Sequence, residues 1–326
     1  MKILGKFLFR ALIFVAVLIA GLGAFGPREP AVLEVVFDDS LLEGGVDGYL
    51  AAQEARFNDI IPGVQKRVIW ADAPEKKTEW SVVYVHGFSA TSEEIRPVPD
   101  RVAKALDANL IFTRLRGHGR PGGAMGEARV ADWMADVAEA LAIAHQIGDR
   151  VLVISTSTGG TLMAAAALDK EMTRRVQGIV MVSPNFGVNS PFEPLLTMPA
   201  ARSWLPLLAG AERSWEPHNE AQGKFWTTTY PSVAVMPMAA LVKEVNARDL
   251  SRISIPALFL YAERDTVVRA EKTKEAARAW GAPTKTVLFY PGEGDDPSRH
   301  VIAGDILSPV ATPRAVEHIL DWAETL

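Results

Sequence analysis

The segment from Val151 to Leu168 joins two different local patterns through a turn of small residues. Val151–Ile154 is a short, mostly β-branched apolar run, which favours a buried strand. Leu162–Leu168 is rich in alanine, leucine and methionine, which favours a helix. The residues between them read Ser-Thr-Ser-Thr-Gly-Gly-Thr. A strand that turns sharply into a helix exposes the residue at its apex, here Ser157, above the edge of a sheet.

The turn is close to the pattern G-x-S-x-G, in which the serine is a nucleophile at a helix N-terminus. Ser157 is the central serine and Gly159 the final glycine, but Ser155 stands in place of the first glycine. That position is crowded by the turn and requires a small side chain, and serine is only slightly larger than glycine. Small residues between a strand and a helix are often an ordinary turn, so the motif alone leaves both interpretations open.

A second turn follows the apolar run Trp80–Val85, where the chain continues as His86-Gly87-Phe88. Gly87 allows the backbone to turn sharply, so that the N–H groups of Phe88 and Thr158 can point at one place. Two such donors form an oxyanion hole. The alternative interpretation is a turn that ends a strand and holds a structural histidine, His86.

Two further polar residues follow predicted strands. Asp265 comes just after Ala257–Tyr261, at the carboxyl end of a strand, where the sites of open α/β sheets lie. Thr286–Tyr290 predicts another strand, and His300 lies in the loop that follows it. Serine, aspartate and histidine in this chain order, each beyond a strand, match one known order of a catalytic triad.

On these residues the chain resembles the α/β-hydrolase superfamily. Within it, the chain looks most like the branch of monoacylglycerol-lipase-like, carboxylesterase and lysophospholipase enzymes with a serine aminopeptidase-type domain. The resemblance extends from about Val68 to the C-terminus and includes the Arg-Gly-His-Gly loop at 116–119. It implies Ser157 as nucleophile, His300 as base and Asp265 as the acid that orients the base.

The resemblance also implies that the N–H groups of Phe88 and Thr158 are the oxyanion donors. His86, Gly87 and Gly159 would support the two turns. No cofactor and no metal are expected, since no histidine pair has the spacing of a zinc motif such as H-E-x-x-H.

Other acids near His300 in the sequence are alternatives to Asp265. Asp295, Asp296 and Asp305 flank the histidine, but Asp265 alone directly follows a predicted strand. The chain has 326 residues and no cysteine, which excludes disulfides and a cysteine nucleophile. A net charge of −5 without blocks of like charge gives no indication of nucleic-acid binding.

From Lys66 onward predicted strands alternate with helices, which predicts an α/β fold with a mostly parallel sheet and helices on both faces. The strands are expected at Arg67–Trp70, Val82–Val85, Leu110–Thr113, Val151–Ile154, Ile179–Val182, Ala257–Tyr261 and Thr286–Tyr290. Val32–Phe37 is a further possible strand in the lead-in. Val130–Ile147 predicts a helix that ends at Gly148.

The predicted organisation has four parts. Residues 1–27 form a membrane anchor or signal segment and residues 28–64 a lead-in. Residues 65–186 and 250–326 form the α/β-hydrolase core, and residues 187–249 are a small helical cap, because they exceed what a crossover needs. The cap is rich in proline and in large apolar residues: Phe192, Leu195, Leu196, Met198, Trp204, Leu205, Leu207, Leu208, Trp215, Phe225, Trp226 and Met236.

About a third of these cap residues are expected to line an apolar pocket above Ser157. The predicted function is therefore a serine hydrolase that cleaves apolar carboxylic esters, with a small-molecule ester as its partner. Two alternatives stay open. One is a peptidase of the same fold that holds a substrate amine with cap carboxylates from Glu193, Glu212, Glu216 and Glu220. The other is a non-enzymatic binding protein, which would normally have lost a triad member.

The N-terminus predicts a membrane segment. Lys2, Lys6 and Arg10 precede sixteen uncharged residues, Ala11–Gly26. As a helix these span about 24 Å, short of a hydrocarbon core of about 30 Å, but a span from Phe7 would reach it if Arg10 extends to the headgroups. The expectation is a single uncleaved span with the catalytic domain outside the cytoplasm. The alternative is a signal peptide that is removed and a secreted or periplasmic enzyme.

Overall fold

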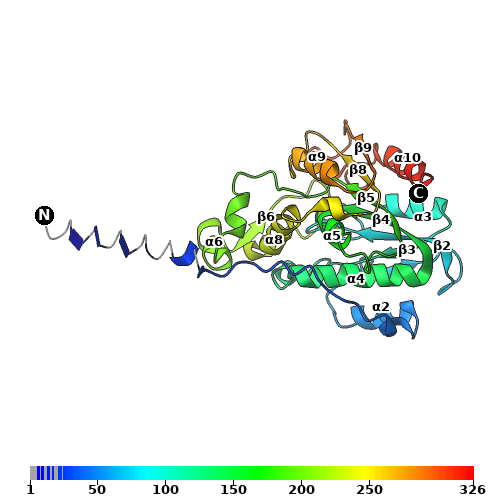
Figure 1. Cartoon of the computed structure of the whole chain (residues 1–326), viewed down its shortest axis with the longest axis horizontal. Coiled ribbons are helices and arrows are strands. Elements are labelled where there is room, and N and C mark those ends of the chain that lie inside the picture. Colours follow the sequence, from blue (N-terminus) through cyan, green and yellow to red (C-terminus); the bar gives the residue numbers. More distant parts are fainter. Residues whose placement is uncertain (1–5, 8, 11–12, 15–16, 18–20, 24) are drawn as a thin grey trace.

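The computed structural model describes residues 6–7, 9–10, 13–14, 17, 21–23 and 25–326 (Figure 1). Its centre is a seven-stranded sheet in the order β1-β3-β2-β4-β5-β8-β9, in which β1 is antiparallel to β3 and the other neighbours are parallel. The predicted α/β fold with a mostly parallel sheet is confirmed. The strands are β1 (Arg67–Ile69), β2 (Thr78–Val85), β3 (Asn109–Phe112), β4 (Gly148–Thr156), β5 (Val176–Val182), β8 (Ala257–Tyr261) and β9 (Thr284–Leu288).

Alternate residues of the central strands pack on opposite faces of the sheet. In β4, Val151 and Val153 belong to one buried cluster, whereas Leu152 and Ile154 belong to another. Both faces are apolar, so both are covered by helices. One face carries α4 (Val130–Ile147), α5 (Thr158–Ala166) and α9 (Ala270–Ala279), and the other carries α3 (Val98–Ala105) and α10 (Thr312–Ala323) (Figure 1).

Between β5 and β8 the chain forms several short elements. These are η3 (Glu193–Thr197), α6 (Ala201–Ala209), β6 (Glu212–Ser214), α7 (Glu220–Phe225), β7 (Thr229–Pro231), η4 (Ser232–Ala234) and α8 (Val235–Asn246), followed by η5 (Leu250–Arg252). Strands β6 and β7 pair as a small antiparallel sheet. Leu205 of α6 and Met236 of α8 share a separate apolar cluster. Leu241 and Val245 of α8 instead join the main core, so α8 also packs as the crossover helix of the sheet.

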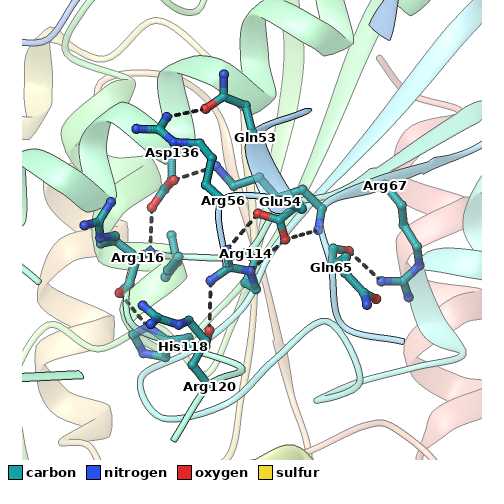
Figure 2. Close-up of polar contacts among 12 residues, drawn as sticks. Gln53, Glu54, Arg56, Gln65, Arg67, Arg114, Arg116, His118, Arg120 and Asp136 are labelled. Atoms are coloured by element: carbon teal, nitrogen blue, oxygen red, sulfur yellow. Dashed lines mark hydrogen bonds and ion pairs between the residues drawn. The ribbon is translucent and has the colours of Figure 1, made fainter. Parts of the chain in front are cut away.

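The lead-in packs against the body through η1 (Asp39–Leu42) and α2 (Val46–Glu54). The segment Val32–Phe37 does not form the possible strand, because no neighbouring strand pairs with it in the described structure; Leu33 is buried there, whereas Val36 is almost fully exposed. At the end of α2, the Glu54 carboxylate receives two hydrogen bonds from the Arg114 guanidinium, at 2.8 and 2.7 Å (Figure 2). The same guanidinium donates to the carbonyl oxygen of His118, so the lead-in contacts the loop at 116–119 directly.

The predicted membrane anchor over Phe7–Gly26 is corrected. Within the described residues, no helix combines the length and the apolar composition that a membrane crossing requires. The uncharged run alone reaches only about 24 Å at 1.5 Å per residue, and a hydrocarbon core of about 30 Å needs roughly 20 apolar residues in one helix. Residues 8, 11–12, 15–16, 18–20 and 24 of the predicted span lie outside the described residues.

Candidate active site

Ser157 lies at the turn between β4 and α5 with φ 51° and ψ −116°. A positive φ is uncommon for a residue with a side chain and marks local backbone strain. Gly159 belongs to the first turn of α5, where an added Cβ would collide with the carbonyl oxygen of Val85 and lie 2.8 Å from that of His86. The lack of a side chain at 159 therefore lets the helix start directly against the end of β2.

Ser155, which replaces the usual first glycine of the motif, is fully buried at the end of β4. Its hydroxyl donates a hydrogen bond to the carbonyl oxygen of Val180 on β5, at 3.0 Å. The additional polar group is therefore satisfied, and the sharp turn forms with serine at this position.

Asp265 and His300, from loops far apart in the sequence, are in direct contact. Asp265 Oδ2 lies 2.7 Å from His300 Nδ1, and both residues are buried. Asp265 Oδ1 accepts hydrogen bonds from the N–H groups of Val267 and Val268, at 2.7 and 2.9 Å. The carboxylate is thus held in place from one side and bonded to the imidazole on the other.

The charge of Asp265 changes the acidity of His300. Burial opposes the charged imidazolium, but the charge of Asp265 and its hydrogen bond outweigh burial, and the pKa of His300 is raised above its usual value. The Asp265 carboxylate therefore favours the protonated, positively charged form of the His300 imidazole.

The other acids near His300 have different contacts. Asp296 accepts hydrogen bonds from the backbone N–H groups of His300 and Val301, at 3.1 and 2.8 Å, and so shapes the loop. Asp295 accepts from backbone N–H groups at the start of α10, and Asp305 is exposed. The structure therefore brings Asp265, and not these three alternatives, to the imidazole nitrogen.

His86 braces the turn at Phe88. Its Nε2 accepts a hydrogen bond from the N–H of Leu115 at 3.1 Å, so a neutral ring carries its proton on Nδ1, which lies 2.9 Å from the carbonyl oxygen of Gly87. Burial, with the nearby charges of His118 and Arg114, lowers the pKa of His86 well below its usual range. This histidine is a structural element of the turn.

The N–H groups of Phe88 and Thr158 are both available at the site. The Phe88 N–H has no hydrogen-bond partner in the described part of the chain. Thr158 is the first residue of α5, where helix N–H groups lack partners within the helix. The Phe88 ring packs edge-on against His118, Trp133 and Tyr230, which fixes the turn from behind.

Ser157, His300, Phe88 and Thr158 all line one cavity of about 840 Å³. A cavity of this size is in the range of ligand-binding pockets. Eight of the twelve large apolar residues singled out in the cap line it, more than the third expected from the sequence: Phe192, Leu195, Leu196, Trp204, Leu205, Leu208, Trp215 and Trp226. The part of the cavity wall that residues 187–249 supply is therefore mainly apolar.

Glu94, which the sequence analysis did not single out, also lines this cavity. Its Oε2 accepts hydrogen bonds from the Gly87 N–H at 2.7 Å and from the Tyr84 hydroxyl at 2.9 Å. Burial raises the pKa of its carboxyl to about 7, although these two hydrogen bonds act in the opposite direction. In the sequence, Glu93-Glu94 is an ordinary charged pair, and no local pattern separates the buried acid from the other one.

Among the residues that the structure describes, no group of three or more histidine, cysteine, aspartate or glutamate side chains could hold a metal ion. None of the four cap carboxylates that could bind a substrate amine is an unpaired acid in the cavity wall. Glu212, Glu216 and Glu220 are exposed and do not line the cavity, and Glu193 lines it but is paired with Arg269.

Comparison with known proteins gives consistent results. A model of the family described as serine aminopeptidase, S33, matches residues 76–294. The thermostable monoacylglycerol lipase of Bacillus sp. (strain H-257) is 29% identical over 187 residues, which cover 57% of this chain and 71% of that protein.

Similar solved structures share the fold. A chain from the work on LipS and LipT, two metagenome-derived lipolytic enzymes, has a TM-score of 0.65 at 19% identity, and the match covers 82% of this chain and 100% of that chain. A soluble variant of the monoglyceride lipase of Saccharomyces cerevisiae has a TM-score of 0.56 at 12% identity, with 82% and 96% of the two chains covered.

Proposed function

The chain belongs to the serine aminopeptidase, S33, family of α/β-hydrolases, and on that premise we propose that it is a serine hydrolase that cleaves apolar carboxylic esters. The main support is one arrangement: a serine on a strained strand-to-helix turn lines the same cavity as His300, whose Nδ1 lies beside the buried Asp265 carboxylate. The Bacillus relative is named a monoacylglycerol lipase, which makes lipid-like esters the first substrates to test.

In the proposed reaction, Ser157 Oγ attacks the ester carbonyl carbon while His300 takes the serine proton. The Asp265 carboxylate holds Nδ1–H, so that Nε2 is the basic nitrogen, and it stabilises the imidazolium that forms. The N–H groups of Phe88 and Thr158 stabilise the developing oxyanion. His300 then returns the proton to the leaving alcohol, and an acyl group remains on Ser157.

The second half of the reaction uses the same groups. Water gives a proton to His300 and attacks the acyl-enzyme. The tetrahedral intermediate then collapses as His300 passes this proton to Ser157 Oγ, which releases the acid and restores both residues. The apolar cap residues, such as Trp204 and Leu205, would bury the hydrocarbon part of the substrate during both steps. Each methylene transferred from water into such a wall contributes up to about 0.8 kcal/mol.

A peptidase activity is the second candidate, because of the family description. Binding of a free substrate amine would need an unpaired carboxylate in the cap. The three exposed cap glutamates do not line the cavity, and Glu193 is engaged by Arg269. The positions of these acids favour the esterase proposal.

A fluorophosphonate probe tests the nucleophile, and a substrate series tests the reaction. The wild type should be labelled and Ser157→Ala should not, with kcat lower by at least about 10⁴. Labelling of Ser157→Ala would refute this assignment. p-Nitrophenyl esters of two to sixteen carbons should be cleaved faster as the acyl chain lengthens, until the cavity is filled. Faster cleavage of aminoacyl amides than of these esters would favour the peptidase.

A further inference from the structure

Glu94 is a buried acid in the wall of the cavity that pairs with no lysine or arginine among the described residues, although the charge of the His300 imidazole acts on its carboxyl. The residue lies between β2 and α3 and is only 2% exposed. Its neighbour Glu93 pairs with Arg67 and Arg96, but in the described part of the chain Glu94 forms no ion pair. Burying an acid without a cationic partner is costly, so its contacts need an explanation.

The two oxygens of the Glu94 carboxyl have different surroundings. Oε2 accepts two hydrogen bonds, from the Gly87 N–H and the Tyr84 hydroxyl, which occupies both of its lone pairs. Oε1 has no hydrogen-bond partner among the described residues, yet it is not one of the buried atoms sealed from solvent. Since Glu94 lines the cavity, Oε1 is the oxygen that is open to it.

The free oxygen is close to the nucleophile because residue 87 is glycine. A Cβ built at Gly87 would lie 2.7 Å from Glu94 Oε1 and 3.1 Å from Ser157 Cβ. Glu94 Oε1 and Ser157 Cβ therefore lie close to each other beside Gly87, and both residues line the cavity that would hold the substrate.

An open acceptor in a mainly apolar cavity distinguishes ligands by their hydrogen-bond donors. A ligand with a hydroxyl at this point satisfies Oε1, whereas an apolar ligand of the same shape displaces water from it and leaves it unpaired. Leaving a buried polar group of this kind unpaired costs more than a hydrogen bond between two neutral partners gains.

We propose that Glu94 Oε1 is a specificity site that accepts a hydrogen bond from a substrate hydroxyl near the scissile ester. The preferred substrate class is then an apolar ester that carries a hydroxyl within two or three bonds of the ester group. This inference rests on the proposed esterase function, and it adds a polar requirement to a pocket that otherwise selects hydrocarbon.

Two matched substrate pairs test the proposal on the wild type. The first is 2-hydroxyethyl laurate against propyl laurate, which places the hydroxyl on the alcohol side. The second is methyl 3-hydroxydodecanoate against methyl dodecanoate, which places it on the acyl side. The wild type should favour the hydroxylated member of at least one pair about tenfold in kcat/KM, and that pair identifies the side that faces Glu94. Absence of a preference in both pairs would overturn the proposal.

Glu94→Gln tests whether this residue causes the preference. The glutamine oxygen must face the Gly87 N–H, since an NH₂ group there would meet another donor, so the NH₂ group takes the place of Oε1 and the acceptor is lost. The kcat/KM ratio within the selective pair should fall by about tenfold. Glu93→Gln, the same change at the neighbouring, partly buried acid, which does not line the cavity, should keep the wild-type ratio.

The outcomes separate this inference from the esterase proposal. An unchanged ratio in Glu94→Gln, including equal losses on both members of a pair, refutes the specificity site and assigns Glu94 to support of the turn. Cleavage of none of the four esters by the wild type refutes the proposed function, and the inference falls with it. Fluorophosphonate labelling of Ser157 checks that Glu94→Gln is folded. If it is not, Glu94→Asp, which withdraws the oxygen by one methylene, is measured in its place and should also lower the ratio.

Discussion

Asp265 Oδ2 and His300 Nδ1 are 2.7 Å apart, although 35 residues separate them in the chain. The loop after β8 supplies the acid and the loop after β9 supplies the base, and these two strands are parallel neighbours at one edge of the sheet. Parallel pairing places the carboxyl ends of both strands on the same side. The contact between Asp265 and His300 is therefore a consequence of the order of the strands in the sheet.

Asp265→Asn should lower kcat by about 10⁴, because an amide at this position favours the wrong imidazole tautomer. The measurement is the steady-state hydrolysis of a p-nitrophenyl ester. Asp305→Asn, an exposed acid five residues from His300, is the matched control and should retain wild-type activity. Wild-type activity of Asp265→Asn would refute the role of Asp265.

The activity of the wild type should rise with pH through an apparent pKa above about 6.5, the ordinary value for histidine. Burial alone would lower the pKa of His300, but Asp265 raises it, and only the neutral imidazole accepts the serine proton. The pH profile of kcat/KM measures this value. A midpoint clearly below 6.5 would contradict the assignment.

The same shift predicts how His300 contributes to stability. Its folded-state pKa is raised, so the folded state binds the proton more tightly than the unfolded state does. The contribution is fully present below the unfolded pKa of about 6.5 and is lost as pH rises through the folded pKa. Urea unfolding of wild type and His300→Ala across this range should show the difference shrinking with rising pH. A difference that grows would contradict it.

Gly159→Ala should destabilise the protein strongly, because the new Cβ would meet the carbonyl oxygens of Val85 and His86. Backbone atoms at the end of β2 cannot move aside without disturbing the sheet, and overpacking of this kind costs about 1–3 kcal/mol or more. Gly123→Ala is the control, since nothing lies within 4 Å of its added Cβ. Urea unfolding measures both, and equal stability of the two variants would be evidence against a tight contact at 159.

Breaking the Glu54–Arg114 pair should destabilise the fold by about 3–5 kcal/mol, because Glu54→Gln leaves a buried guanidinium without its counter-charge. The side chains of this pair are 8% and 3% exposed. Asp72→Asn, which breaks an exposed pair with Lys76, should have little effect. A double-mutant cycle with Arg114→Met measures the coupling, and additive effects of the two changes would show that the pair is not coupled.

The core of the fold could be predicted from the sequence because its central strands are buried on both faces and bounded by clear turns. Each predicted strand of the sheet overlaps an observed strand, and Val130–Ile147 is a helix with the predicted bounds. The order of Ser157, Asp265 and His300 along the chain placed each one beyond a strand, where the structure has them. Contacts that follow from the order of the strands can therefore be predicted from sequence patterns.

Other features depend on contacts that no local pattern records. The sequence of Val32–Phe37 is typical of a strand, but a strand also needs a partner to receive its hydrogen bonds. In the sequence Glu94 resembles a surface acid, and only the folded structure shows that it is buried and accepts hydrogen bonds from Tyr84 and Gly87. For the N-terminal segment, the predicted span reaches the required length only if Arg10 is counted within it, and no helix of the described residues has the length and apolar composition of a membrane span.

The hydroxyl of Ser155, bonded to Val180 on the adjacent strand, has a consequence for recognising such proteins from their sequences. The first position of the elbow motif demands small volume and does not demand the conformational freedom of glycine, since Ser155 does not have a positive φ. A pattern search that requires glycine there passes over this chain. A search that accepts serine and instead requires glycine two residues after the central serine retains it, because a side chain at 159 would meet the Val85 carbonyl.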